Sequence, residues 1–248
     1  MMKLPEKSSL CFVLSSTRYG EDSAIVSLAG KEGIFSVLAR GVYKPKSNLK
    51  PLLISGDLLR LSYREGKDDF GIAASLQVME DNSMLSACYE NSCFLLFLQE
   101  ITFALFRYGD AFPSHDIYLI LRHLSKGNDP LTSALLVLAS YAKALGVDSK
   151  IDGCILCGRK DRITTYSLET GGFVCKDCQE KKHVPEKGKL ELYILKFIFS
   201  PLTEETFLHQ VPEKEGKKVL EDLIDHLSSC FDMKPLKTLS LFLSSLQE

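Results

Sequence analysis

Two pairs of cysteines in the second half of the chain have a spacing typical of metal sites. Cys154 and Cys157 form the first pair, and Cys175 and Cys178 form the second after 17 intervening residues. This spacing falls within the C-x2-C-x15–20-C-x2-C pattern of tetrahedral zinc sites. Two thiolates separated by two residues can face the same ion at about 2.3 Å. The sequence therefore predicts that four thiolates hold one Zn²⁺ ion.

The predicted zinc is expected to be structural. Four thiolate ligands complete the coordination shell and leave no position for an activated water. The residues between the pairs predict a two-stranded ribbon at 163–168 and 173–174, with glycines at Gly158, Gly171 and Gly172 for the turns. Such a ribbon is too small to have its own core, so the metal would supply stability that burial cannot.

Other ligands and other chemistries remain open for the cysteines. Four thiolates also hold iron–sulfur clusters, and paired thiols can be redox groups. His183 could replace one cysteine as a ligand, although its neighbours Lys181 and Lys182 favour a solvated surface position. The cysteines without paired spacing lie in apolar runs and are expected to be small core residues: Cys11, Cys88, Cys93 and Cys230.

A second chemical signal is the basic segment 40–50. It reads Arg-Gly-Val-Tyr-Lys-Pro-Lys-Ser-Asn-Leu-Lys, with four positive residues, no acidic residue and one tyrosine. Phosphate backbones attract such a run regardless of base sequence, and an aromatic ring offers a stacking face to an unpaired base. Composition alone leaves a solvated surface loop as the alternative.

The overall composition indicates a folded protein of one large domain or two smaller ones. The chain has 248 residues, of which 45% are hydrophobic and 25% are charged. Its longest apolar stretch without a charge, 130–142, is shorter than the roughly 18 residues needed to cross a bilayer. The apolar run 10–14 is too short for a secretion signal, so we expect a cytoplasmic protein without a membrane span. A formal net charge of -2 gives no argument from bulk charge for nucleic-acid binding.

The first 80 residues predict a small barrel or sandwich of strands. Leu59, Leu61 and Tyr63 alternate with polar residues, which places one face of a strand on a core and the other in water. Glycines or proline separate several of the apolar runs, and a boundary is expected near Asp81. The runs read as strands are 9–16, 24–28, 34–41, 57–63 and 70–78.

The rest of the chain predicts helices, with the cysteine segment inserted between them. Helical spacing marks 89–106, where the helix is expected to be buried on most of its surface, and further helices at 114–124, 130–145, 190–197, 219–231 and 236–246. The predicted fold class is α+β. The predicted domains are a barrel at 1–80, a helical domain at 81–150 and 189–248, and a zinc finger at 151–188.

The order of several motifs resembles the opening of the RecO family of bacterial DNA repair and recombination mediator proteins. The matching runs are Arg-Tyr-Gly-Glu at 18–21, Ile-Val-Ser-Leu at 25–28, Gly-Ile-Phe at 33–35 and Ala-Arg-Gly-Val-Tyr-Lys-Pro-Lys-Ser at 39–47. The four-cysteine finger within an acidic helical body is similar to that family too. The resemblance implies an N-terminal OB-fold, a helical domain and a zinc finger.

The resemblance also implies a function and its residues. RecO proteins bind single- and double-stranded DNA, anneal complementary strands, and act with RecR and single-stranded DNA-binding protein so that recombinase can be loaded. By this resemblance the protein is a nucleoid-associated cytoplasmic one whose best DNA contacts are Arg40, Lys44 and Lys46. Lys50 and Tyr43 are further candidates.

The family binds the C-terminal tail of single-stranded DNA-binding protein in a groove of the helical domain. Arg107, Arg122 and Lys126 are sparse positive residues in an otherwise acidic segment, and they are candidates to face the carboxylate of such a peptide.

Motifs of covalent catalysis are missing from the sequence. There is no glycine-rich phosphate loop with Lys-Ser/Thr, no G-x-S-x-G elbow and no H-E-x-x-H helix. Together with the family resemblance, which implies a DNA-binding mediator, the missing motifs predict that the protein is not an enzyme. The alternative is a zinc-ribbon protein-interaction module that does not bind nucleic acid directly.

Overall fold

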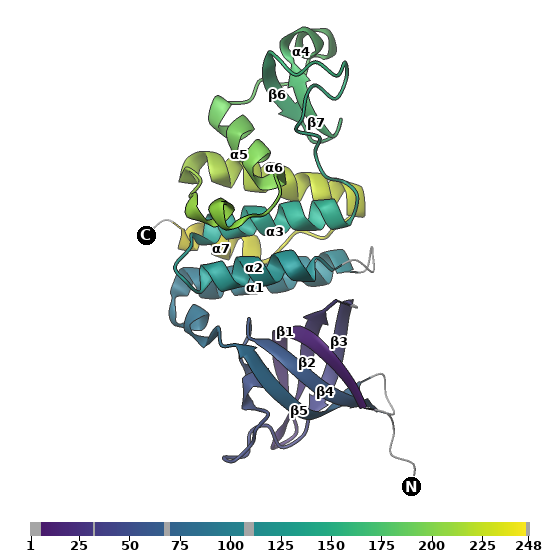
Figure 1. Cartoon of the computed structure of the whole chain (residues 1–248), viewed down its shortest axis with the longest axis vertical. Helices are drawn as coiled ribbons and strands as arrows, with labels where there is room; N and C mark the ends of the chain where they lie inside the picture. Colours follow the sequence, from purple (N-terminus) through teal and green to yellow (C-terminus); the bar gives the residue numbers. More distant parts are fainter. Residues whose placement is uncertain (1–5, 32, 67–69, 107–111, 247–248) are drawn as a thin grey trace.

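The computed structural model describes residues 6–31, 33–66, 70–106 and 112–246. These residues form three parts that follow one another along the long axis of the molecule (Figure 1). A β-barrel occupies one end, layers of helices lie in the middle, and a small ribbon with a short helix stands at the opposite end. The fold is α+β, as the sequence predicts.

The described N-terminal strands close into a five-stranded barrel in the order β1-β2-β3-β5-β4. Neighbouring strands are antiparallel except β3 and β5, whose parallel pairing aligns Val37 with Gly71 and completes the closure. Closure leaves no open sheet edge, and the result is an OB-like barrel. The strands are β1 (Glu6–Tyr19), β2 (Ser23–Gly30), β3 (Gly33–Ala39), β4 (Leu58–Glu65) and β5 (Gly71–Glu80).

Alternating apolar side chains fill the barrel. On β4, Leu59 and Leu61 are fully buried, whereas Arg60 between them is exposed. Val26 and Leu28 alternate in the same way on β2. The period of two predicted at Leu59 and Leu61 is confirmed. β1, β2, β4 and β5 are longer than the apolar runs that predicted them, because backbone pairing continues past the buried residues.

The helical body is organised around α3, which is buried along most of its length and contacts α1, α2, α5 and α6. The Asp129 side chain caps this helix by accepting a hydrogen bond from the backbone N–H of Thr132 at 2.7 Å, and Pro130 occupies the first turn. The helices are α1 (Tyr89–Phe106), α2 (Ser114–Leu124), α3 (Pro130–Ala144), α5 (Lys189–Phe199), α6 (Glu213–Phe231) and α7 (Thr238–Ser245), with short 3-10 turns at Lys50–Leu53, Ser83–Ala87 and Glu204–Leu208.

The helix α1 is less enclosed than its sequence predicts. Leu96 and Phe103 are 45% and 38% exposed and lie on the same face of the helix. The reason is the layer order: α1 lies in the layer beside the barrel, whereas α3 lies between layers of helices (Figure 1).

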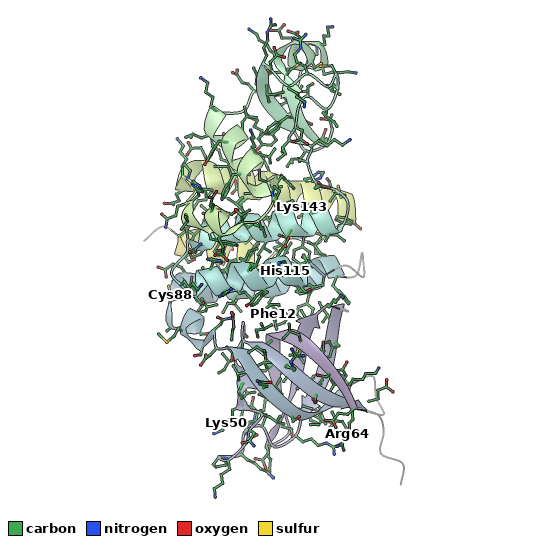
Figure 2. All side chains as sticks on the ribbon, in the orientation of Figure 1. Phe12, Lys50, Arg64, Cys88, His115 and Lys143 are labelled. Atoms are coloured by element: carbon green, nitrogen blue, oxygen red, sulfur yellow. The ribbon has the colours of Figure 1, made fainter. Side chains whose placement is uncertain are left out.

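A shared apolar core joins the barrel to the helices. Phe12 of β1, labelled in Figure 2, and Leu58 of β4 belong to the same buried cluster as residues of α1 and α2. At the edge of this interface the buried carboxyl group of Asp57 accepts a hydrogen bond from the backbone N–H of Asn82 at 2.8 Å. The Asn82 side chain donates to the carbonyl of Gly56 at 2.9 Å. These bonds fix the segment that leaves the barrel.

The finger lies between α3 and α5. Its ribbon consists of β6 (Ile163–Ser167) and β7 (Gly172–Cys175), which confirms the predicted strands. A short helix, α4 (Lys176–Lys182), follows and was not predicted. None of its residues is buried, so apolar periodicity gives no sign of it.

Gly172 ties the base of the finger to the ribbon. It has a φ of 153° and pairs with Lys150, the residue that leads into the finger. The Lys150 carbonyl accepts a hydrogen bond from Phe173 at 3.0 Å, and the Lys150 N–H donates to Gly171 at 2.8 Å. The chain entering the finger thus passes directly over the backbone of Gly172.

Candidate metal centre and nucleic-acid interface

The four sulfur atoms predicted as metal ligands lie together in the finger. The Sγ atoms of Cys154, Cys157, Cys175 and Cys178 are all within 4.8 Å of one another. Those of Cys157 and Cys175 are 3.7 Å apart, close to the separation of about 3.8 Å that four thiolates at 2.3 Å from one ion would have. A disulfide would need about 2.05 Å, and all four thiols are free. The cluster fits one tetrahedral metal ion.

Two backbone turns position these sulfurs. In the first, the N–H of Gly158 donates to the carbonyl of Cys154 at 2.8 Å, with Gly158 at a φ of 77° that favours glycine. In the second, Cys175 ends β7 and occupies the position before α4, so Cys178 lies in the first turn of that helix. The turn after Cys154 positions one pair of thiols, and the first turn of α4 positions the other pair, so that all four lie around a common centre.

The backbone favours the thiolate form at Cys154. Burial raises the pKa of this thiol, but hydrogen bonds to its sulfur outweigh burial and lower the pKa to about 6. The backbone donors are the N–H groups of Cys175, Leu156 and Cys157. Because the thiolate is the form that binds metal, this arrangement suits a metal ligand.

Ion pairs join the two halves of the finger. Arg159 follows the first cysteine pair, and its guanidinium donates to the carboxylate of Asp177, which lies inside the second pair. Arg162 lies 3.5 Å from the other oxygen of Asp177. The positive charges of both arginines are therefore partnered within the finger.

His183 is not part of the sulfur cluster. Among the described residues, the group that could hold a metal consists of the four cysteines. His183 instead ends α4 in a left-handed conformation with a φ of 54°, and it is exposed.

The cysteines outside the cluster have different environments. Cys11 and Cys93 are buried and Cys88 is partly buried. The prediction of a core position was wrong for Cys230, which is exposed because it lies on the outer face of α6, 3.9 Å from the ring of His226.

The predicted basic segment lies at the end of the barrel remote from the helices, where Figure 2 labels Lys50. It connects β3 to β4, and the buried side chains of Val42 and Leu52 anchor it in the barrel core. This anchoring leaves the polar side chains outside. The predicted contacts are all exposed: Arg40, Tyr43, Lys44, Lys46 and Lys50.

The charges of this segment are only partly neutralised. Lys44 Nζ lies 3.8 Å from the carboxylate of Asp22, and both side chains are exposed. Lys50 Nζ donates to the carbonyl of Pro45 at 2.9 Å. Among the ion pairs formed by described residues, none involves Arg40 or Lys46.

The structure adds Arg18 to this surface. Its guanidinium carbon lies 5.1 Å from the centroid of the Tyr43 ring, and the N–H of Tyr43 donates to the carbonyl of Asp22 at 3.0 Å. The β1–β2 turn and the basic segment therefore form one surface. Arg18 lies 22 residues before Arg40, so a local composition signal cannot include it. We name this surface the basic patch, and it consists of Arg18, Arg40, Tyr43, Lys44, Lys46 and Lys50.

The structure describes two of the three positive residues predicted for the peptide groove. Arg107 lies outside the described residues. Arg122 is engaged at the junction with the barrel, where its Nε lies 3.5 Å from the Glu80 carboxylate, which also accepts a hydrogen bond from Tyr118 at 2.6 Å. Lys126 is exposed. Their role in binding a peptide stays a prediction.

Two family models match this chain. The model described as Recombination protein O N terminal matches residues 2–79, and the model described as Recombination protein O C terminal matches residues 93–230. The chain belongs to the RecO family. The resemblance stated from the motifs is confirmed, and the two matches include the barrel strands and most of the helical body of this RecO chain.

Curated relatives carry the name DNA repair protein RecO. The protein of that name from Syntrophomonas wolfei is 27% identical over 176 residues, which cover 68% of this chain and 69% of the relative. The one from Bacillus pumilus is 28% identical over 181 residues, which cover 68% and 67% respectively. Within its described residues, this RecO chain has no helix that is both long and apolar enough to cross a membrane.

Proposed function

We propose that this chain binds single- and double-stranded DNA through the basic patch and anneals complementary strands. The supporting observation is that exposed positive side chains and an exposed tyrosine gather on one end of a closed OB-like barrel. Neutralising two phosphate backbones lowers their mutual repulsion, and base pairing supplies the driving force for annealing. No covalent step is needed, so the proposed protein is not an enzyme.

The proposed metal is a structural Zn²⁺ held by the four cysteines. A set of four thiolates without another ligand favours zinc in a closed site, which leaves no coordination position for a reacting water. The bound ion would supply cohesion to a ribbon and helix with very little buried apolar surface of their own.

Membership of the RecO family supports the rest of the proposal. We propose RecR and the C-terminal tail of single-stranded DNA-binding protein as partners, with loading of recombinase on single-stranded DNA as the outcome. The place of action is the cytoplasm, at the nucleoid. The proposed division is a barrel domain at 1–80, a helical domain at 81–150 and 189–248, and the finger at 151–188.

Charge reversal of the basic patch tests the proposal. The triple variant Arg40→Glu, Lys44→Glu and Lys46→Glu should bind oligonucleotides at low salt more weakly than the parent, and it should not accelerate annealing above the protein-free rate. Because the three side chains are exposed, the fold should survive, which circular dichroism checks. A matched control reverses three exposed lysines outside the barrel and the finger, Lys214, Lys234 and Lys237, and should bind and anneal like the parent.

Two outcomes would contradict this proposal, and the second of them favours the protein-interaction module. If the triple variant binds and anneals like the parent, the basic patch does not hold DNA. If the parent protein, loaded with metal, neither binds oligonucleotides nor accelerates annealing, alone or with its partner proteins, the proposed function is wrong.

A further inference from the structure

A cleft of about 430 Å³ lies between the finger and α5. Its volume is within the range of about 300–1,000 Å³ that is usual for small-molecule and cofactor sites. The finger and the segment entering it form one wall, and α5 forms the other. Its polar and aromatic lining includes Asp152, Lys160, Phe173, Lys189, Tyr193 and Lys196.

The spacing of residues along α5 explains why this wall is basic and aromatic. Lys189, Tyr193 and Lys196 are separated by four and then three residues, so they share one face of the helix. The opposite face carries Ile194 and Ile198, which are buried in the helical core and hold the helix in place. Because the face with Ile194 and Ile198 is buried, the face with the lysines and Tyr193 is directed to the cleft.

The lysines of the cleft have no partners within the described part of the chain. No hydrogen bond or ion pair involves the side chain of Lys160, Lys189 or Lys196. The arginines of the same finger differ, because Asp177 pairs with both of them. Three lysines face one aspartate in the cleft, so the site attracts an anion.

An open aromatic ring lies between the lysines of α5. Tyr193 is 52% exposed, and Phe197 stacks against it with ring centroids 6.4 Å apart and an angle of 12° between the planes. Aromatic rings flanked by positive side chains bind single-stranded nucleic acids, because bases stack on the ring while phosphates pair with the charges. An acidic peptide would use the lysines but has no group that needs the open ring.

We propose that this cleft is a second binding site for single-stranded DNA. A base stacks on Tyr193, and the flanking phosphates pair with Lys189, Lys196 and Lys160. The proposal rests on the proposed DNA-binding function and extends it. The finger and the basic patch lie at opposite ends of the molecule with the helices between them (Figure 1), so one molecule can hold two DNA segments at once.

A tryptophan at position 193 tests this site directly. The chain contains no tryptophan, so the emission of Tyr193→Trp reports on the cleft alone. Addition of a short oligothymidylate should quench this emission to saturation. Adding Lys189→Glu and Lys196→Glu to the reporter should shift the midpoint of quenching at least about tenfold to higher oligonucleotide concentration. Two attractive phosphate contacts are lost, and the glutamates repel the phosphates instead. The control Tyr89→Trp, at the exposed start of α1, should show no quenching.

Anisotropy of the same oligonucleotide, carrying a dye, separates the two proposals. Quenching that persists in the Arg40→Glu, Lys44→Glu, Lys46→Glu background supports a separate site. Binding by anisotropy without quenching at position 193 overturns the cleft site and leaves the proposed function standing. Absence of both signals overturns both proposals. Quenching by a glutamate-rich peptide but not by the oligonucleotide overturns the DNA site in favour of peptide binding.

Discussion

Each cysteine of the finger offers one of the four sulfur atoms of the proposed metal site, so its loss is not compensated within the cluster. The replacement Cys175→Ser should lower the metal content from one ion per chain to near zero, as measured by inductively coupled plasma mass spectrometry. Hydrogen exchange should rise within the finger but not in the barrel, because the binding energy of a structural metal is folding energy for the segment that holds it.

The exposed Cys230 provides the control for this change. Cys230→Ser should keep one metal ion and unchanged hydrogen exchange, because this thiol lies on α6 and outside the cluster. A Cys175→Ser protein that still holds one ion per chain would contradict the assignment of the ligands.

The sequence predicted the residues of the cysteine cluster more completely than those of the basic patch. The four cysteines were predicted because metal coordination needs a fixed residue type at a local spacing. Arg18 was not predicted as part of the basic patch, because its position over Tyr43 depends on the pairing of the β1–β2 turn with a later segment. Likewise, the exposure of Cys230 depends on which face of α6 is packed, and its local apolar neighbours do not show this.

At the scale of elements, the junction between barrel and helices should respond to pH. Burial raises the pKa of Asp57 to about 6, partly offset by the hydrogen bond from Asn82. The folded state therefore binds this proton more tightly than the unfolded state, and the free energy of unfolding falls as the pH rises from about 4 to about 6. Relative to the parent, Asp57→Asn should gain stability across this interval, by up to about 3 kcal/mol, as measured by urea unfolding at several pH values.

The neighbouring Asp81 should behave in the opposite way. Hydrogen bonds from Ser83 lower its pKa, so its contribution is present above its ordinary pKa and is lost as the pH falls. Asp81→Asn should therefore lose a little stability at neutral pH relative to the parent and none in acid. A stability difference between Asp57→Asn and the parent that does not vary with pH would contradict the role given to Asp57.

The entry to the finger depends on a glycine. A Cβ atom at position 172 would lie 2.2 Å from the carbonyl oxygen of Lys150, whereas at position 171 it would meet nothing within 4 Å. Gly172→Ala should lower the thermal stability of the finger and speed metal loss to a chelator. Gly171→Ala should cost only about 1 kcal/mol of backbone strain. Equal effects of the two changes would show that Lys150 does not pack closely on Gly172.

Periodicity predicted most of the elements but not how they join. The strands and the longer helices each bury an apolar stripe, and this stripe is visible in the sequence. The helix α4 buries no residue and gives no such signal. The parallel pairing of β3 with β5, which closes the barrel, joins strands that are distant in the chain, and no local pattern encodes it.

For the whole molecule, the distribution of charge matters more than its sum. The net charge of -2 gives no long-range attraction to DNA, so binding must come from local groups. The basic patch and the lysines near the finger lie far apart along the axis, while the helices that separate them carry more acidic than basic residues. DNA should therefore be held at the ends of the molecule and not along its middle.

The salt dependence of binding tests the central claim most directly. The affinity for single-stranded DNA falls with salt by about 0.7 logarithmic units per phosphate contact for each tenfold increase in salt. Anisotropy titrations at several salt concentrations give the slope of the logarithm of the binding constant against the logarithm of the salt concentration. The account predicts a steep negative slope for the parent protein. For the variant with Arg40, Lys44 and Lys46 replaced by neutral glutamine, it predicts a slope that is smaller in magnitude by about 2. Equal slopes for the two proteins would contradict the claim that these side chains hold DNA phosphates.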